Sequence, residues 1–247
     1  MREDLEQENL FYRKALYHSE YGKIGRDYLQ QRGLNSETIK QWEIGWSPYG
    51  CIPNNFKNWP EDFKPWPKLW GRITFPVRDQ SGKMVSISGR LVLDLKDRPK
   101  YDHYPFNARK ILFGLFQNKE EIRSFDKVII TEGQIDVISS WQEGLKIVVS
   151  SFGAHCSLDH FALISRYASV VNILYDEDAA GKNGTDAIEE FPTFGDLKVE
   201  LKQGIFPKGE DLDKWIKKHS VEELFIIMNK TKNDELKQKL IQLKRDR

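Results

Sequence analysis

The first part of the chain, residues 5–31, carries apolar residues at the spacing of amphipathic helices. The apolar positions of the first set are Leu10, Phe11, Ala15 and Leu16, and a second set runs from Ile24 to Leu29. Gly22 stands between the two sets and predicts that they form separate helices. Gly33 is suited to end the second helix. Asn35 or Ser36 is suited to begin a short third one, so the pattern predicts a small helical element here.

Alternation of apolar and polar residues replaces the helical spacing between residues 71 and 93. The apolar positions are Ile73, Phe75 and Val77 in one run, followed by Val85, Ile87, Leu91 and Leu93. A period of two residues predicts β-strands with one buried face. Ser81-Gly82 lies between the two runs and predicts a hairpin turn.

From residue 126 onward, short β-branched runs alternate with stretches of helical spacing. The predicted strands lie near residues 127–131, 146–151, 170–175 and 197–201, and the predicted helices near 134–143, 157–167 and 180–191. This alternation predicts a parallel sheet with right-handed crossovers. Two further helices close the chain, the last being amphipathic through Leu236, Leu240 and Leu243.

These patterns predict an α/β protein in three parts. Residues 1–125 would form an N-terminal α+β lobe, residues 126–209 a parallel-sheet domain, and residues 210–247 a C-terminal helical segment. A chain of 247 residues is long enough to bury a sizeable core in such a fold.

Acidic residues follow two of the predicted strands at the point where each strand ends. Glu132 follows the run 128–130, and Asp176 and Asp178 follow the run 170–175. Ligands of open α/β sheets gather beyond the carboxyl ends of the strands, so neighbouring strands would bring these acids to one crevice. Acids in one crevice repel one another unless a cation lies between them, and Mg²⁺ prefers oxygen ligands. The alternative is that each acid is an ordinary solvated loop residue.

Composition excludes several other classes of protein. Lys and Arg number 38 and Asp and Glu number 37, so the net charge by itself predicts no partner. The two cysteines, Cys51 and Cys156, form no CxxC pair, which argues against a zinc ribbon and a disulfide framework. The N-terminus lacks the apolar region of a secretory signal, and no apolar run approaches membrane-spanning length.

The stretch from Lys68 to Lys110 is more basic than the rest of the chain. Its cations are Lys68, Arg72, Arg78, Lys83, Arg90, Lys96, Arg98, Lys100, Arg109 and Lys110, and its acids are Asp79, Asp94, Asp97 and Asp102. A basic excess on a sheet, in a chain that is otherwise neutral, is typical of a surface that binds a polyanion. A solvated strand face with lysines at its edge is the other interpretation.

Tryptophan and proline are concentrated in residues 42–70. The tryptophans are Trp42, Trp46, Trp59, Trp66 and Trp70, and the prolines lie at positions 48, 53, 60, 65 and 67. So many prolines exclude a long helix or a central strand. The aromatic side chains would either stack on unpaired bases or, as we favour, hold a proline-rich loop against the body of the protein.

Two of these segments carry residues that resemble the signature of a known protein family. Thr131-Glu132-Gly133 with Asp136, followed by the segment Tyr175-Asp176-Glu177-Asp178-Ala179-Ala180-Gly181, resembles the signature of the TOPRIM metal-binding fold. The wider series resembles the RNA polymerase core of bacterial DnaG-type primases over residues 8–215. Its other members are Phe11-Tyr12 through Tyr28-Leu29, Gln31-Arg32-Gly33-Leu34, Ile44-Gly45-Trp46-Ser47-Pro48, Gly71-Arg72-Ile73-Thr74-Phe75-Pro76-Val77-Arg78-Asp79, Ser88-Gly89-Arg90, Pro99-Lys100-Tyr101, Leu112-Phe113-Gly114-Leu115 and Phe206-Pro207 with Gly209, Asp211 and Asp213.

The resemblance implies a DNA primase that makes short RNA primers on single-stranded DNA by metal-dependent nucleotidyl transfer. The residues implied to hold Mg²⁺ or Mn²⁺ are Glu132, Asp176 and Asp178, helped by Asp136, Asp211 and Asp213. The residues implied to line the path of template and nucleotide are Arg72, Arg78, Arg90, Lys100 and Tyr101. It also implies NTP substrates, a replicative helicase or other replication protein as partner, no membrane, and the cytoplasm of a bacterium or a phage-infected bacterium.

The chain departs from the family pattern at a few positions. Gln134 stands where the family often has Tyr, Glu177 where it often has Gly, and Asp102-His103-Tyr104-Pro105 where it has Ser-Pro-Glu. We expect neither the zinc ribbon that precedes this core in DnaG-type primases nor the helicase-binding domain that follows it. This favours a cut-out core or a compact relative from a virus or mobile element.

Two other functions remain compatible with the sequence. One is a TOPRIM nuclease, which would use the same acids and metal to cleave a strand. The other is a replication adaptor that binds single strands without turnover. The complete set of three acids favours the enzyme over the adaptor.

Overall fold

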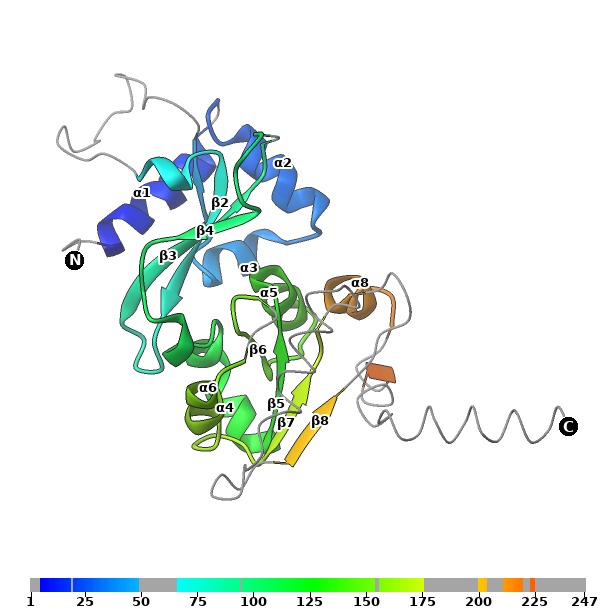
Figure 1. Cartoon of the computed structure of the whole chain (residues 1–247). Helices are drawn as coiled ribbons and strands as arrows, with labels where there is room; N and C mark the ends of the chain where they lie inside the picture. The colour runs from blue at the N-terminus through cyan, green and yellow to red at the C-terminus, as the bar shows by residue number, and fades with distance from the viewer. Residues whose placement is uncertain are drawn as a thin grey trace, which may run out of the picture. The chain divides into compact units, whose positions relative to one another are not determined.

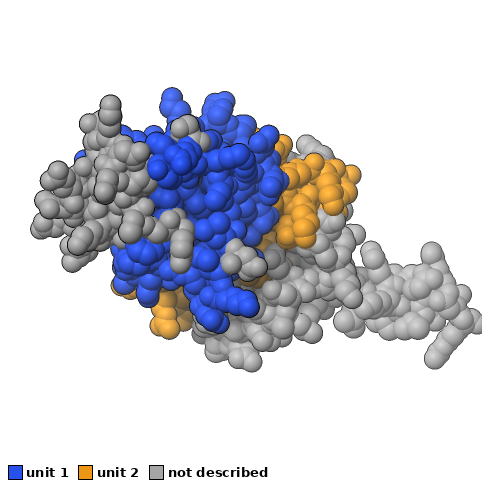
Figure 2. All heavy atoms as spheres, turned by 90° about the horizontal axis from the view of Figure 1, so that it is seen from above, with its two compact units in different colours: residues 1–106 blue, residues 107–247 orange. Residues whose placement is uncertain are grey.

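The computed structural model divides the chain into two compact units, residues 1–106 and 107–247 (Figure 2). The structure describes residues 5–18, 20–48, 66–93, 95–153, 156–175, 200–203, 211–219 and 223–224. The helix predicted near 180–191 and the amphipathic one at the end of the chain lie outside the described residues. The α/β class and the parallel sheet expected from the sequence are confirmed.

The first unit opens with the helices α1 (Leu5–Tyr17), α2 (Lys23–Gln31) and α3 (Ser36–Gln41) (Figure 1). Gly22 separates the first two helices and Gly33 has a φ of 70° beyond the end of α2, both as expected. Asn35 is the N-cap of α3, and its side chain accepts a hydrogen bond of 2.8 Å from the backbone N–H of Thr38.

Replacing Asn35 with alanine is expected to lower the free energy of unfolding by about 1 kcal/mol, because the Thr38 N–H loses its acceptor. Asn35→Asp, which keeps an oxygen at the same place, should retain most of the stability. Urea denaturation of the two variants beside the wild type checks this. Equal loss in both would show that the cap oxygen is not the stabilising group.

The first unit contains an antiparallel sheet with the strand order β1-β2-β3-β4. Its strands are β1 (Gly45–Ser47), β2 (Arg72–Arg78), β3 (Met84–Leu91) and β4 (Tyr101–His103), with the 3-10 turn η1 (Pro67–Leu69) before β2. The central hairpin and its turn at Gly82 were predicted from the alternation. The two edge strands were not, because three residues are too few to show a period.

Helix α1 packs on this sheet at close range. A Cβ on Gly45 would lie 2.5 Å from the Cβ of Tyr12, so only glycine allows β1 to approach the helix. Beneath the helix, the buried carboxylate of Glu8 accepts hydrogen bonds of 2.5 Å from the hydroxyls of Tyr12 and Tyr104. Burial, with Glu8 as a further cause, raises the pKa of Tyr12 well above its usual value.

Two of the tryptophans expected to hold the proline-rich loop are core residues. Trp42 is 2% exposed and Trp46 is 1% exposed, so neither ring is available to stack on a base. The ring of Trp66 stacks on Tyr104, with centroids 4.4 Å apart. Trp59 lies outside the described residues.

The second unit contains a parallel sheet with the strand order β6-β5-β7-β8 (Figure 1). Its strands are β5 (Lys127–Thr131), β6 (Val148–Ser150), β7 (Val170–Ile173) and β8 (Glu200–Gln203). Its helices are α4 (Leu115–Phe125), α5 (Gln134–Gln142), α6 (Leu158–Ile164) and α8 (Leu212–Ile216), with the 3-10 turn η2 (Ala108–Lys110). The chain runs from β5 to β6 on one side and then to β7 on the other, so right-handed crossovers place α5 and α6 on opposite faces.

The boundary between the units lies earlier than the expected one at residue 125. Phe113 forms an antiparallel bridge with Ser150, and the amide of Asn118 in α4 donates a hydrogen bond of 2.7 Å to the carbonyl of Val148. Helix α4 was not predicted from the sequence, and it belongs to the second unit because its buried side covers β5 and β6.

Within the described parts of the chain, no helix combines the length and the apolar character that crossing a membrane would need.

Candidate functional site

The carboxyl ends of β5 and β7 lie side by side. These two strands pair in parallel, with Ile130 opposite Ile173, and the N–H of Leu174 donates a hydrogen bond of 2.9 Å to the carbonyl of Ile130. The chain leaves β5 toward β6, whereas β7 lies on the other side of β5. This is the point at which strand order reverses, where α/β sheets form their ligand crevice. The two strands after which the acids were expected are therefore neighbours, and the positions of Asp176 and Asp178 stay a prediction.

Glu132 follows β5 directly and is half-buried at this edge of the sheet. Its backbone carbonyl accepts a hydrogen bond of 2.6 Å from the hydroxyl of Ser150, the last residue of β6. The Glu132 backbone is thus fixed to the end of β6.

Asp136 fixes the turn that carries Glu132 from the other side. Its Oδ2 accepts hydrogen bonds from the hydroxyl of Thr131 and the backbone N–H of Gly133, each 3.2 Å long. A carboxylate in the first turn of α5 also suits the positive end of the helix dipole. The sequence suggested Asp136 as a helper of the metal site, and its observed contacts are those of a residue that shapes the Thr-Glu-Gly turn.

A hydrogen bond of 2.9 Å joins the hydroxyl of Ser151, just after β6, to that of Tyr175, just after β7. This contact spans β5 and fixes the last described residue before Asp176. Burial raises the pKa of Tyr175 far above its usual value, and the neighbouring Cys156 and Glu132 add to the rise. Tyr175 therefore remains a neutral phenol, and Cys156, whose pKa burial raises to about 12, remains a thiol.

The turn after β6 has unusual backbone geometry. Phe152 has a φ of 63°, a region that costs energy for a residue with a side chain. The hydroxyl of Ser150 accepts from the N–H of Phe152 at 3.1 Å, and the hydroxyl of Ser151 donates to the carbonyl of Gly153 at 2.7 Å. The two serines thus stabilise a strained turn beside Glu132.

The structure describes two of the other four expected acids, Asp211 and Asp213. Asp176 and Asp178 lie outside the described residues, and among the residues described no three His, Cys, Asp or Glu side chains form a metal-binding group. Asp211 is the N-cap of α8, with Oδ1 accepting from the N–H of Lys214 at 2.8 Å. Asp213 is buried and pairs with Lys217 at 2.5 Å. Helix α8 packs on α5, the helix that begins at the Thr-Glu-Gly turn.

Arg72, expected on the nucleic-acid path, is inside the first unit. Its side chain is fully buried and donates to four backbone carbonyls, at distances of 2.8 to 3.2 Å. The acceptors are the carbonyls of Lys68, Gly89, Pro99 and Lys100. Burial lowers the pKa of Arg72, but an arginine in a protein stays charged. In this position Arg72 cannot reach a phosphate, and it instead holds the backbone that carries Lys100.

Arg78, also expected on that path, is neutralised within the same unit. Its guanidinium binds the carboxylate of Glu6 at 2.7 Å and that of Glu43 at 2.6 Å, and it also donates to the carbonyl of Gly82 at 2.9 Å. Burial would lower the pKa of Arg78, but the two carboxylates raise it on balance. Arg13 joins this ion-pair network through Glu43. Arg78 therefore joins α1, the end of α3 and the hairpin.

The environment of Arg90 differs from those of Arg72 and Arg78. Its side chain is half-buried, and its guanidinium donates a hydrogen bond of 2.8 Å to the hydroxyl of Tyr101. In the part of the chain that the structure describes, no acidic side chain forms an ion pair with it. Burial opposes the charge, but Tyr101 and Tyr28 raise the pKa of Arg90. Lys100 is exposed next to Tyr101. Of the three expected arginines, Arg90 is the one positioned to bind an anion.

Two residues at these sites were not singled out from the sequence. Ser151 is one serine in a loop, and no spacing distinguishes it from its neighbours. Tyr28 was given no role at the site from the sequence, although its ring contacts both Arg32 and Arg90.

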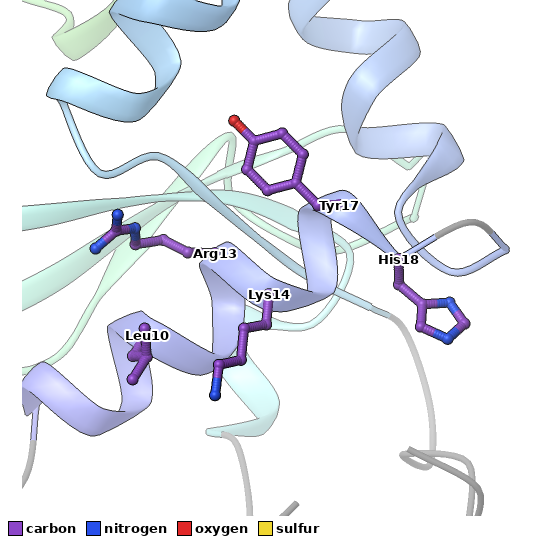
Figure 3. A pocket seen from close by; sticks show the side chains of 5 residues that line it. All are labelled: Leu10, Arg13, Lys14, Tyr17 and His18. Atoms are coloured by element: carbon purple, nitrogen blue, oxygen red, sulfur yellow. The ribbon is translucent and has the colours of Figure 1, made fainter. Parts of the chain in front are cut away.

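A shallow depression of about 380 Å³ lies along an exposed face of α1. Its lining side chains are Leu10, Arg13, Lys14, Tyr17 and His18, and they point in different directions (Figure 3). No group of polar atoms converges there, so this depression lacks the features of a catalytic site.

Comparison with known proteins gives consistent matches. A Toprim-like family model matches residues 129–216. A DNA primase of Halalkalibacterium halodurans is 31% identical over 86% of this chain and 38% of its own length. A DNA primase of Staphylococcus epidermidis is 30% identical over 90% of this chain and 40% of its own length. The chain thus spans about two-fifths of the length of these curated relatives.

Solved structures extend the similarity to three dimensions. A structure of the DnaG catalytic core has a TM-score of 0.76 and 26% identity, covering 91% of this chain and 78% of that one. A DnaG primase catalytic domain bound to single-stranded DNA has a TM-score of 0.75 and 27% identity, covering 91% of this chain and 76% of that one.

Proposed function

This chain is a homologue of bacterial DNA primases and corresponds to their catalytic core, and we propose that it synthesises short RNA primers on single-stranded DNA. The observation that carries the proposal is the pairing of β5 with β7. It brings the strand that Glu132 follows next to the strand that precedes Asp176 in the sequence, at the switch point of the sheet. Acids at neighbouring strand ends are what a metal-dependent nucleotidyl transferase needs.

Divalent metal use follows from the Toprim-like domain and the primase relatives. The donors at the proposed site are carboxylate oxygens, which suit Mg²⁺ or Mn²⁺ better than a soft metal. Glu132, Asp176 and Asp178 would hold the metal, with Asp211 and Asp213 contributing from the start of α8. When bound, the metal would acidify the attacking 3′-hydroxyl and neutralise charge on the leaving pyrophosphate.

The described residues around the site would act by orienting these acids. Asp136 and Ser150 fix the turn that carries Glu132. The Ser151–Tyr175 hydrogen bond fixes the chain just before Asp176. Because Tyr175 and Cys156 stay neutral, they add no further negative charge beside the carboxylates. Positioning of this kind lets the site bind a metal without rearranging its own backbone.

The template would bind the first unit at Arg90, Lys100 and Tyr101. The relative solved with single-stranded DNA supports this class of ligand. An arginine can bind a phosphate bidentately, and a tyrosine ring can stack on a base. We further propose NTPs as the second substrate, a replicative helicase or another replication protein as the partner, and the bacterial cytoplasm as the compartment.

Primer synthesis on mixed-sequence single-stranded DNA tests the function directly. Labelled NTPs are followed on a gel with Mg²⁺ or Mn²⁺, beside the Asp176→Ala variant. Oligomers that disappear in the variant are the expected result. Metal-dependent cleavage of a labelled strand in their place would establish a nuclease. DNA binding without any product would establish a binding module.

Replacing Arg90 with alanine is expected to weaken single-strand binding and to lower the slope of log affinity against log salt by about one unit. The reason is the loss of one cation that contacts phosphate. Fluorescence anisotropy at several salt concentrations measures both quantities. Lys83→Ala removes an exposed cation at the opposite end of β3 and is the matched control. An equal effect of both variants would mean that affinity reflects net charge alone.

A further inference from the structure

Helix α1 has a buried face and an exposed face. The residues of the buried face that belong to the core are Phe11, Tyr12, Ala15 and Leu16. Leu10, Lys14 and Tyr17 follow one another at intervals of four and three residues, which places them together on the exposed face. Leu10 is 39% exposed and Tyr17 is 59% exposed. Two large apolar side chains of one helix face are therefore accessible to a partner.

The shallow depression of about 380 Å³ on this helix includes both apolar side chains in its lining. The complete lining, which we call the α1 surface, is Leu10, Arg13, Lys14, Tyr17 and His18. In Figure 3, Leu10 and Lys14 point to one side of the helix axis and Tyr17 points to the other. A segment that lies along α1 would therefore contact side chains on both sides of the helix axis. The spacing of Leu10, Lys14 and Tyr17 is also that of the anchor residues by which one helix binds another surface.

The α1 surface carries a net positive charge. None of the described residues that line it is acidic, and the ammonium of Lys14 forms no ion pair with any described residue. Arg13 binds Glu43 at 3.2 Å, and Glu43 also binds Arg78, which in turn binds Glu6. That network contains two cations and two anions, so Lys14 adds an uncompensated charge beside it. A positive, partly apolar surface is complementary to a segment that is acidic and partly apolar.

We propose that the α1 surface docks an acidic amphipathic helix of a partner protein. The apolar residues of that helix would lie against Leu10 and Tyr17, and its carboxylates would bind Lys14 and Arg13. A nucleic acid suits this surface less well, because apolar side chains stand between the cations and interrupt the path of a phosphate backbone. A second copy of this chain would place like charges opposite each other. The proposal goes beyond primer synthesis, since the docking would occur whether or not the chain makes primers.

Synthetic peptides are the probes of the first test. The first peptide is an amphipathic helix of about four turns with leucines on one face and glutamates on the other. A second peptide has lysine in place of every glutamate, and a third has serine in place of every leucine. Fluorescence anisotropy measures the binding of each peptide to the whole chain. We expect the glutamate–leucine peptide to bind most tightly, and equal binding of all three, or no binding of the first, would overturn the proposal.

Two substitutions locate the binding on the α1 surface. Tyr17→Ser removes the more exposed apolar side chain and is expected to weaken binding of the glutamate–leucine peptide by about tenfold. Lys14→Glu reverses one charge and is expected to weaken it by about fivefold at low salt and by less at high salt. Phe125→Ser is the matched control, because Phe125 is an apolar residue of the second unit that is 62% exposed. An equal loss in Phe125→Ser would mean non-specific adhesion and would refute a site on α1.

The charge reversal also separates docking from damage to the fold. Lys14→Glu should bind the lysine–leucine peptide more tightly than the wild type does, which a disordered helix would not do. Thermal unfolding of each variant shows whether it is folded, and Tyr17→Gln replaces Tyr17→Ser if the latter is not. Failure of the folded Lys14→Glu variant to gain affinity for the lysine–leucine peptide would overturn the proposal.

The same variants test the two other occupants of this surface. We expect single-strand binding and primer synthesis to be unchanged in Tyr17→Ser and Lys14→Glu. A loss of single-strand binding with unchanged peptide binding would assign the surface to nucleic acid and overturn the proposal. Analytical ultracentrifugation of the chain alone would overturn it by showing a dimer that Tyr17→Ser dissociates. If the wild type makes no primers but binds the peptides as expected, the proposed function fails and this inference stands.

Discussion

Primer synthesis is expected to fall by about 10³-fold when Glu132 is replaced by glutamine, with single-strand binding unchanged. The substitution keeps the size of the side chain and removes one negative charge from the carboxyl edge of β5. A metal held by carboxylates then loses both a ligand and part of the charge that attracts it. Steady-state synthesis measured over a range of Mg²⁺ and Mn²⁺ concentrations checks the prediction. If the loss comes from weaker metal binding, the rate of synthesis should partly recover at high metal-ion concentration.

The same substitution separates catalysis from folding. Without metal, acids gathered in one crevice repel one another, so Glu132→Gln should unfold at the same temperature as the wild type or higher. Asp159→Asn, which removes an exposed carboxylate in α6 of the same unit, is the matched control and should retain activity. A Glu132→Gln protein that is folded yet no longer binds DNA would contradict the division between a metal site and a template path.

Replacing Arg72 with methionine is expected to lower the free energy of unfolding by about 3 kcal/mol. Methionine fills much of the space but donates no hydrogen bond. The carbonyls of Gly89, Pro99 and Lys100 then lose their hydrogen-bond donor. Those carbonyls that remain buried cannot bind water instead and are left unsatisfied. Urea denaturation of the variant beside the wild type measures the loss.

The Arg72 variants also decide between two roles for this arginine. If Arg72 contacted phosphate, Arg72→Met would weaken DNA binding and leave stability nearly unchanged. If it holds the backbone under Lys100, stability falls and DNA affinity falls with it, because Lys100 and Tyr101 lose their support. Arg72→Lys is the informative control, since an ammonium keeps the charge but cannot span acceptors on three segments. Stability restored by lysine would contradict the role inferred from the structure.

The sequence by itself determined the elements and the location of the acids. A period of two residues predicted β2 and β3, and the alternation of β-branched runs with helical spacing predicted the sheet of the second unit. Both signals are local, because they depend on which face of one element is buried. Glu132 could be placed at a strand end for the same reason. The strands β1 and β4, of three residues each, show no period and were found only in the structure.

Only the tertiary structure decided which strands are neighbours and which cations are available. The order β6-β5-β7-β8 makes β5 and β7 adjacent, although β6 lies between them in the chain. Arg72, Arg78 and Arg90 are the same residue type in one basic stretch, but Arg72 is buried among carbonyls and Arg78 is bound to two carboxylates. Among the described residues, the charge of Arg90 lies next to tyrosine hydroxyls and rings. Their partners are brought in from distant parts of the chain. The environment of an arginine therefore depends on long-range packing, which no local pattern records.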